Sequence, residues 1–234
     1  MKQLFFIANW KSYKTVDEAK SFLEGFKAEP TDLENKEIIV CPTYTLIPAM
    51  HAYIKEHNLP LKLGVQDVSS FGEGSYTGAV NAKQAAEFVT HAVIGHSERR
   101  KYFHETDEDV LQKVKLLLEN NITPILCVSD MAQMDYYLDN GAVIKENADK
   151  IIFVYEPPGA ISGGGAFKKV GVEEANENAS EISKKIGKKV ITAYGGSVNP
   201  ENAAALCGQD HIDGGLIGQA SLNPETFLQI IKNS

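Results

Sequence analysis

Residues that can move protons, carry charge or hold an anion follow several short apolar runs of this sequence. A lysine, a histidine and a glutamate stand shortly after three of these runs, at Lys11, His96 and Glu156. Glycine-containing turns, 194–197 and 218–221, follow two others. The three side chains suit acid–base catalysis and charge stabilisation, and glycine lets backbone N–H groups approach an anion closely. A polar site is therefore expected if the fold brings these segments together.

The apolar runs predict eight buried β-strands. Most runs are continuous rather than alternating, which is typical of strands covered on both faces of a parallel sheet. They are residues 4–8, 38–40, 61–65, 92–94, 122–126, 151–155, 190–193 and 214–217. Helical patterns lie between them, at about 30 residues per strand–helix unit, as in a (β/α)8 barrel. The predicted fold is thus α/β, a TIM barrel of eight parallel strands with outer helices, and an open doubly wound sheet is the alternative.

Local signals mark where several of the helices begin. Thr15 and Glu18 form a capping-box pattern, and Thr106 opens a second helix. Apolar residues at helical spacing over 172–186 predict a third helix. At 199–200 and at 223–224, an asparagine precedes a proline, which predicts a capped helix with proline at its first position. In such a barrel the residues after the strands meet at one rim. We also expect a single domain over residues 1–234.

Composition excludes several classes of protein. Lys and Arg number 23 against 31 Asp and Glu, a net charge of -8, so a generally basic nucleic-acid-binding surface is excluded. No apolar run reaches the ~18 residues that a membrane span needs, and the apolar start is too short for a signal peptide. The 3 cysteines are widely spaced and favour reduced thiols in a cytoplasmic protein. Cys127 is expected in the core. We expect no metal and no cofactor.

Five ordered motifs resemble the triosephosphate isomerase family over essentially the whole chain. They are Asn9-Trp10-Lys11, Gly95-His96-Ser97-Glu98-Arg99-Arg100, Tyr155-Glu156-Pro157, Tyr194-Gly195-Gly196-Ser197-Val198 and Gly218-x-Ala220-Ser221-Leu222. The resemblance implies a homodimeric barrel in glycolysis and gluconeogenesis. It would interconvert dihydroxyacetone phosphate and D-glyceraldehyde 3-phosphate through an enediolate.

The same resemblance implies a role for each polar residue. Glu156 is the base that moves the proton next to the carbonyl, and His96 is the electrophile that serves both oxygens. Lys11 stabilises the developing negative charge, and Asn9 orients the substrate. Glu98 is expected to pair with Lys11 and hold it in place. A short helix that begins after His96 would point its N-terminus at a neutral imidazole.

Phosphate binding, a lid and a dimer loop are also implied by the resemblance. Asn9 and Lys11 would contact the phosphate together with the backbone N–H groups of Ser162, Ser197, Gly218 and Gln219. The lid would include Pro157, Pro158, Gly159, Gly163, Gly164 and Gly165. The dimer loop would include Gln66, Tyr76, Thr77 and Gly78, with Thr77 beside Asn9 of the partner subunit. This chain departs from the family pattern at both hinges of the lid and at Gln219, where a glycine is usual.

Two other functions are compatible with such a barrel. One is a different phosphosugar enzyme, such as an aldolase or an indole-forming synthase. An aldolase needs a Schiff-base lysine on a central strand, and only Lys62 and Lys189 lie at or inside strand edges, neither beside the Glu/His pair. The other is a catalytically inactive phosphate-binding or scaffold protein, which would be expected to lack Glu156, His96 or Lys11.

Overall fold

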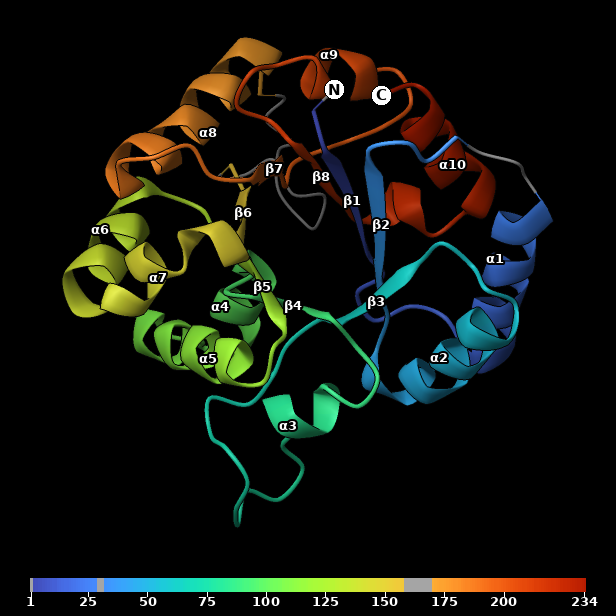
Figure 1. Ribbon diagram of the computed structural model, residues 1–234, viewed down its shortest axis with the longest axis horizontal. Helices are drawn as coiled ribbons and strands as arrows, with labels where there is room; N and C mark the ends of the chain where they lie inside the picture. The colour runs from blue at the N-terminus through green and yellow to red at the C-terminus, as the bar shows by residue number, and fades with distance from the viewer. Residues whose placement is uncertain (1, 29–31, 158–169) are drawn as a thin grey trace.

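Eight parallel strands close into a barrel in the computed structural model, which describes residues 2–28, 32–157 and 170–234. Each strand pairs with the next along the chain, and the last pairs with the first (Figure 1). The strands are β1 Leu4–Asn9, β2 Lys36–Cys41, β3 Lys62–Val65, β4 His91–Ile94, β5 Thr123–Val128, β6 Ile152–Tyr155, β7 Thr192–Tyr194 and β8 Gly214–Ile217. The predicted TIM barrel is confirmed, and the open sheet is excluded by closure.

Helices surround the barrel and cover the outer face of its strands (Figure 1). The α-helices are α1 Val16–Ala28, α2 Ile47–Glu56, α3 Ala82–Ala85, α4 Ser97–Phe103, α5 Asp107–Glu119, α6 Met131–Asn140, α7 Ala142–Glu146, α8 Val172–Ile186, α9 Ala203–Cys207 and α10 Pro224–Lys232. Three short 3-10 helices are η1 Tyr44–Leu46, η2 Ala148–Lys150 and η3 Gln219–Ser221. None of the helices in the described ranges is long and apolar enough to cross a membrane.

The capping signals were right at three sites and wrong at one. The Thr15, Thr106 and Asn223 side chains accept backbone N–H bonds at the starts of α1, α5 and α10. Asn199 was expected to cap a helix beginning at Pro200, but α9 begins three residues later, at Ala203. The Asn199 side chain instead accepts the N–H groups of residues 201 and 202, at 2.9 and 3.0 Å. It therefore stabilises a turn, because asparagine bonds to nearby backbone in turns as readily as at helix starts.

Each strand buries both of its faces, which explains why the apolar runs are continuous. On β1, Phe5 and Ile7 point into the barrel interior, whereas Phe6 and Ala8 pack against the helices. The interior cluster also contains both buried cysteines, Cys41 and Cys127. The expectation that Cys127 is a core residue is confirmed.

The end of the barrel where the strands begin carries a charged cluster on β2, β3 and β4. The Glu37 carboxylate lies 2.8 Å from Lys62 Nζ and 3.2 Å from Nε2 of the buried His91. The bond from His91, with a smaller contribution from Lys62, lowers the pKa of Glu37 to about 2. Because the site predicted above lies where strands end, this cluster is expected to serve stability rather than chemistry.

We expect Glu37→Gln to destabilise the fold by about 2 kcal/mol at pH 7. This value is smaller than the free energy that corresponds to the whole pKa shift of Glu37, because the carboxylate is partly solvated. A carboxylate with a lowered pKa stabilises the folded state above the unfolded pKa of about 4.3. That contribution is lost as the pH falls from there toward 2. Denaturant unfolding of both proteins between pH 7 and pH 3 measures the difference.

The gap in stability between wild type and Glu37→Gln should stay constant down to about pH 5 and then shrink. Glu181→Gln is a matched control, because Glu181 pairs with Lys184 on the exposed face of α8 and is 44% exposed. It should change stability little at any pH. A Glu37→Gln gap that is independent of pH would contradict the assignment.

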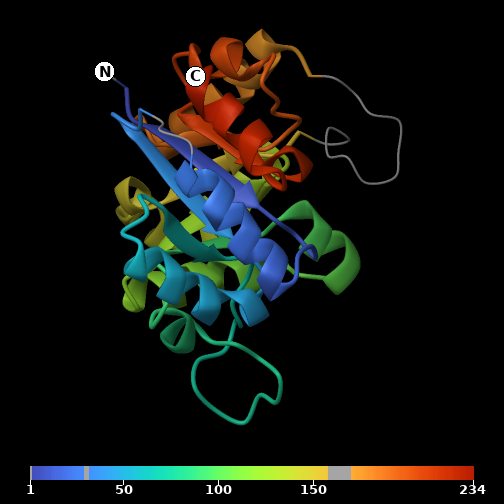
Figure 2. The ribbon, with the colours of Figure 1, turned by 90° about the vertical axis from the view of Figure 1, so that its right-hand side faces the viewer.

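The segment between β3 and α3 leaves the body of the barrel as a long loop (Figures 1 and 2). Backbone hydrogen bonds hold it together, from the N–H of Ser69 to the carbonyl of Val80 and from the N–H of Ala79 to that of Tyr76. Phe71 and Tyr76 stack with ring centroids 4.5 Å apart, yet both are about half exposed, at 53% and 45%. The loop thus presents a paired aromatic surface to its surroundings.

Candidate active site

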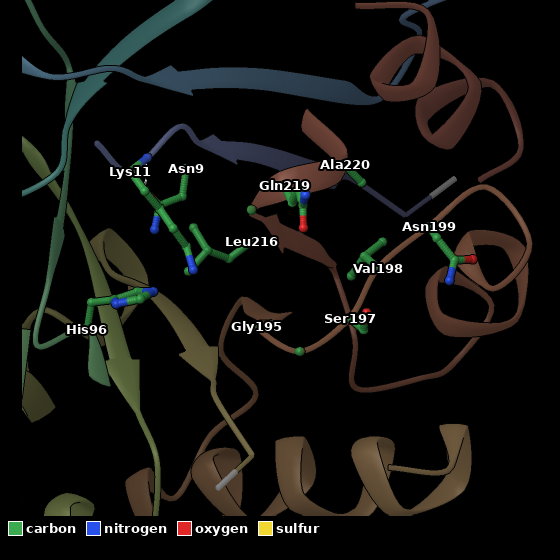
Figure 3. Close-up of a pocket in the computed structure, with 12 residues that line it drawn as sticks. Asn9, Lys11, His96, Gly195, Ser197, Val198, Asn199, Leu216, Gln219 and Ala220 are labelled. Atoms are coloured by element: carbon green, nitrogen blue, oxygen red, sulfur yellow. Dashed lines mark hydrogen bonds between the residues drawn. The ribbon is translucent and has the colours of Figure 1, made fainter. Parts of the chain in front are cut away.

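A cavity of about 350 Å³ opens where the strands end. Figure 3 shows Lys11 and His96 on one side of it, with Ser197 and Asn199 on the other. Its lining comes from the last residues of β1 and β8 and from the segments after β1, β4, β7 and β8. The lining residues are Asn9, Lys11, His96, Gly195, Gly196, Ser197, Val198, Asn199, Leu216, Gly218, Gln219 and Ala220. Residues up to about 210 positions apart in the chain thus share one small cavity, within the size range of small-molecule sites.

Lys11 is held in a fixed place by its own backbone and by Glu98. Its Nζ lies 2.6 Å from Glu98 Oε1, so the predicted pairing is confirmed. Its backbone has a φ of 50°, in the left-handed region that a non-glycine residue rarely adopts. The Asn9 side chain accepts the Lys11 N–H at 3.1 Å. A Cβ on Gly218 would stand 3.8 Å from Lys11 Nζ, so the ammonium also lies beside the turn after β8.

His96 sits at the N-cap of α4, as predicted. Its Nδ1 accepts the backbone N–H of Glu98 at 3.1 Å. A ring nitrogen that accepts carries no proton, so this bond places the proton of a neutral imidazole on Nε2. The Arg100 side chain supports the preceding turn by donating to the carbonyl of Gly95 at 2.9 Å. The imidazole is 7% exposed and is therefore fixed in orientation.

Glu156 is fully buried and lies against His96 rather than in the lining of the cavity. Its Oε1 is 3.0 Å from His96 Nε2, and its Oε2 accepts the backbone N–H of Ser97 at 2.9 Å. The Oε1 contact lacks the alignment of a good hydrogen bond, which leaves that oxygen without a partner among the described residues. The absence of a side chain at Gly195 makes room for this arrangement, since a Cβ there would come within 2.9 Å of Glu156 Cγ.

The side of the cavity opposite His96 offers backbone donors. The N–H groups of Ser197 and Gln219 have no hydrogen-bond partner in the part of the chain that the structure describes. An unpaired N–H beside a polar cavity is a site for an anion. The short helix η3 begins directly at Gln219, whereas the helix that follows Ser197, α9, begins only at Ala203.

Part of the predicted site is placed elsewhere or cannot be described. Ser162, Pro158, Gly159, Gly163, Gly164 and Gly165 lie outside the described residues, and the buried Pro157 directly follows Glu156. Tyr76, Thr77 and Gly78 lie on the projecting loop between β3 and α3 and do not line the cavity of their own chain. Gln66, expected in that loop, turns its side chain back toward Lys11, to whose carbonyl it donates at 2.9 Å.

Burial limits the chemistry of the other titratable groups near the barrel interior. It raises the pKa of the Cys127 thiol well above its ordinary value, so this thiol is a poor nucleophile at neutral pH. Burial also raises the pKa of Tyr194 to about 12, which keeps this phenol protonated. Among the described residues, no group of three or more His, Cys, Asp or Glu side chains could hold a metal ion.

Sequence reasoning missed contacts that support the site. The strand-end rule that identified Lys11 and His96 applies equally to Gln66, the first residue after β3. Its glutamine type gave no chemical signal, because an amide neither titrates nor carries charge. The role of the Ser97 N–H as a partner of Glu156 depends on the turn into α4, which residue types alone do not reveal.

Comparisons with known proteins agree with this geometry. The family model described as triosephosphate isomerase matches residues 4–234. The triosephosphate isomerase of Dictyoglomus thermophilum is 36% identical, over 100% of both chains. Those of Fusobacterium nucleatum and Trichodesmium erythraeum are 37% and 35% identical, each over 99% of both chains. A closed barrel with this cavity and full-length matches to a single family lead to one conclusion: the chain belongs to the triosephosphate isomerase family, and is an isomerase.

Proposed function

We propose that the protein interconverts dihydroxyacetone phosphate and D-glyceraldehyde 3-phosphate through an enediolate. The observation that carries this proposal is the meeting of an imidazole and an ammonium at one cavity with free backbone donors, with a buried carboxylate directly against the imidazole. The reaction moves a proton between neighbouring carbons. It therefore needs one base, a hydrogen-bond donor to the reacting oxygens and a binding site for the phosphate. Each of these parts has a candidate here.

Glu156 is the proposed base, and His96 the proposed electrophile. In the free protein the Glu156 carboxylate rests on the Ser97 N–H and beside His96 Nε2. It would turn from these contacts toward the substrate carbon, take the proton there and return it to the adjacent carbon. With Nδ1 accepting from α4, His96 keeps its proton on Nε2 and can donate it to the oxygen that becomes negative.

Lys11 and the backbone donors are proposed to stabilise the negative charges of the enediolate and of the phosphate. The Lys11 ammonium stands between the reacting centre at His96 and the turn at Gly218, so one charge can serve the enediolate and the phosphate. The N–H groups of Ser197, Gly218 and Gln219 would bind the phosphate, with Ser162 as a further proposed donor. Asn9 would orient the substrate, and Glu98 would hold Lys11 through its 2.6 Å ion pair. A lid beginning at Pro157 would exclude water.

A coupled assay with the purified protein tests the proposal. The expected result is interconversion of the two triose phosphates without added metal or cofactor. No turnover would contradict it and favour an inactive phosphate-binding barrel. An aldolase is disfavoured, because Lys62 stands at the opposite end of the barrel paired with Glu37, and Lys189 bonds to the Asp210 carbonyl outside any strand. Cleavage or condensation of sugars in place of isomerisation would reverse that conclusion.

We further propose a homodimer formed through the projecting loop, acting in the cytoplasm in glycolysis and gluconeogenesis. The stacked pair of Phe71 and Tyr76 stays about half exposed in the single chain, which favours burial against another protein surface. In the proposed dimer, Thr77 and Gly78 reach the partner's site, near Asn9 of the partner subunit. All three cysteines are free thiols, which suits a reducing compartment.

Tyr76→Asp should convert the dimer into a monomer at micromolar concentration and lower turnover by at least about 10-fold. The reason is that a buried, unpaired carboxylate at an interface costs several kcal/mol. Sedimentation velocity and the coupled assay measure the two effects. Lys184→Asp is the control, since it places the same charge on the exposed face of α8 and should leave a dimer. A wild-type protein that is active as a monomer would contradict the proposal.

A further inference from the structure

The side chain of Gln66, the residue directly after β3, contacts the backbone of Lys11. Both hydrogen-bond donors of the Gln66 amide are used, because Nε2 donates to the carbonyl of Lys11 at 2.9 Å and to the carbonyl of Cys41 at 2.8 Å. One half-buried side chain thus ties together the end of β2 and the segments that follow β1 and β3. No charge is brought into the site by this contact.

The backbone that Gln66 holds is strained. Lys11 adopts a φ of 50°, where Cβ crowds the carbonyl oxygen of a non-glycine residue. Such a conformation is unfavourable for a residue with a Cβ and persists only where the surroundings enforce it. Three contacts do so here: the Asn9 side chain on the Lys11 N–H, the Trp10 N–H on the Cys41 carbonyl at 3.1 Å, and the Gln66 amide on the Lys11 carbonyl.

The direction of the Lys11 side chain depends on this backbone. If the residue relaxed to an ordinary φ, its Cα–Cβ bond would point elsewhere, and the ammonium would leave the cavity and the Glu98 carboxylate. The side chain alone cannot fix the ammonium, because a lysine has a long, flexible stem. The hydrogen bonds to the backbone of Lys11 therefore fix the position of the ammonium together with the Glu98 ion pair.

We propose that Gln66 is a positioning residue for the reaction, which holds Lys11 in its strained conformation and so aims the ammonium at the substrate. This inference rests on the proposed function, in which Lys11 stabilises the enediolate and the phosphate. It gives Gln66 a task inside its own subunit, in addition to its predicted place in the dimer loop. Gln66 touches no substrate and acts only through Lys11.

Gln66→Met tests the proposal, because methionine keeps the shape of the side chain and removes both donors. We expect kcat/KM to fall about 10- to 100-fold, with a higher KM and a lower kcat together, since a misplaced charge weakens binding and chemistry alike. Binding of 2-phosphoglycolate, a phosphate-bearing carboxylate that resembles the enediolate, should weaken by about 10-fold. Should Gln66→Met fail to fold, Gln66→Asn retains the amide but draws it back by one methylene group, and the same losses are expected.

A double-mutant cycle separates positioning from a general loss of stability. In the Lys11→Ala background, Gln66→Met should change the affinity for 2-phosphoglycolate by less than about twofold, because the residue through which it acts is gone. Gln84→Ala is the matched control. The Gln84 side chain accepts the backbone N–H of Asn81 at the start of α3, away from Lys11, so its loss should leave kcat/KM unchanged. Sedimentation at the assay concentration shows that each protein compared is in the same oligomeric state.

Two results would overturn the proposal. One is a folded Gln66→Met or Gln66→Asn protein with kcat/KM within twofold of wild type. The other is an equal loss of analogue affinity with and without Lys11. Either would leave the isomerase proposal standing, because that depends on turnover by the wild-type protein, measured alongside. A wild-type protein without turnover would instead contradict the proposed function, and the analogue-binding cycle would still report whether Gln66 acts through Lys11.

Discussion

Glu156→Gln is expected to lower kcat by about 10³-fold or more while the protein still binds 2-phosphoglycolate. The amide is nearly the same size as the carboxylate but cannot take a proton, and a positioned base contributes about 10²- to 10⁴-fold. The donors on the far side of the cavity, Ser197 and Gln219, are untouched by the change. Coupled turnover and calorimetric binding of the analogue measure the two quantities.

Glu156→Asp distinguishes the loss of the base from the loss of packing. Aspartate keeps a carboxylate but draws it back by one methylene group, so we expect it to retain more activity than Glu156→Gln. Both variants keep a polar group for the Ser97 N–H, the bond that holds Glu156 in the free protein. Turnover near wild type in Glu156→Gln would show that another residue is the base.

Lys11→Ala is expected to lower kcat/KM by about 10²-fold or more and to weaken binding of the analogue as well. One ammonium beside both His96 and Gly218 serves the reacting oxygen and the phosphate, so its removal affects both steps. Bonds to charged groups contribute about 1.5–3 kcal/mol each, which is the basis of this figure. Steady-state kinetics and the inhibition constant of the analogue test it.

The variant Lys11→Ala also leaves the Glu98 carboxylate without its 2.6 Å partner at the edge of the site. Part of the loss could then come from repulsion between that carboxylate and an anionic substrate. The double variant Lys11→Ala/Glu98→Gln removes the repulsion, and we expect it to recover only a minor part of the activity. Unchanged kinetics in Lys11→Ala, or full recovery in the double variant, would contradict the role proposed for Lys11.

The barrel could be predicted from the sequence because its strands are buried on both faces. Runs such as 214–217 and 4–8 are continuous and apolar, and all eight predicted strands lie within two residues of the observed bounds. Helix starts were predicted correctly where the N-cap side chain bonds to the backbone of the helix, as Thr106 does. The start at Pro200 was wrong, because an asparagine followed by a proline also favours a turn.

The site could be predicted only as far as strand ends determine it. Residues that follow the strands were expected to share one site, because the parallel strands of a barrel all end at the same rim. Asn9, Lys11, His96 and the two glycine turns do line one cavity. The strand-end rule could not give the rest position of Glu156 against the Ser97 N–H, nor the left-handed backbone of Lys11. Both depend on the turns that leave the strands, whose dihedral angles are set by contacts far apart in the sequence.

A crystal structure with 2-phosphoglycolate bound tests the central claim most directly. The account predicts that the phosphate lies on the N–H groups of Ser197, Gly218 and Gln219, with Lys11 Nζ in contact with the ligand. It also predicts that the carboxylate of the ligand lies between Glu156 and His96, with Glu156 turned away from the Ser97 N–H. An analogue bound outside this cavity, or bound with Glu156 still resting on Ser97 and out of reach of the ligand, would contradict it.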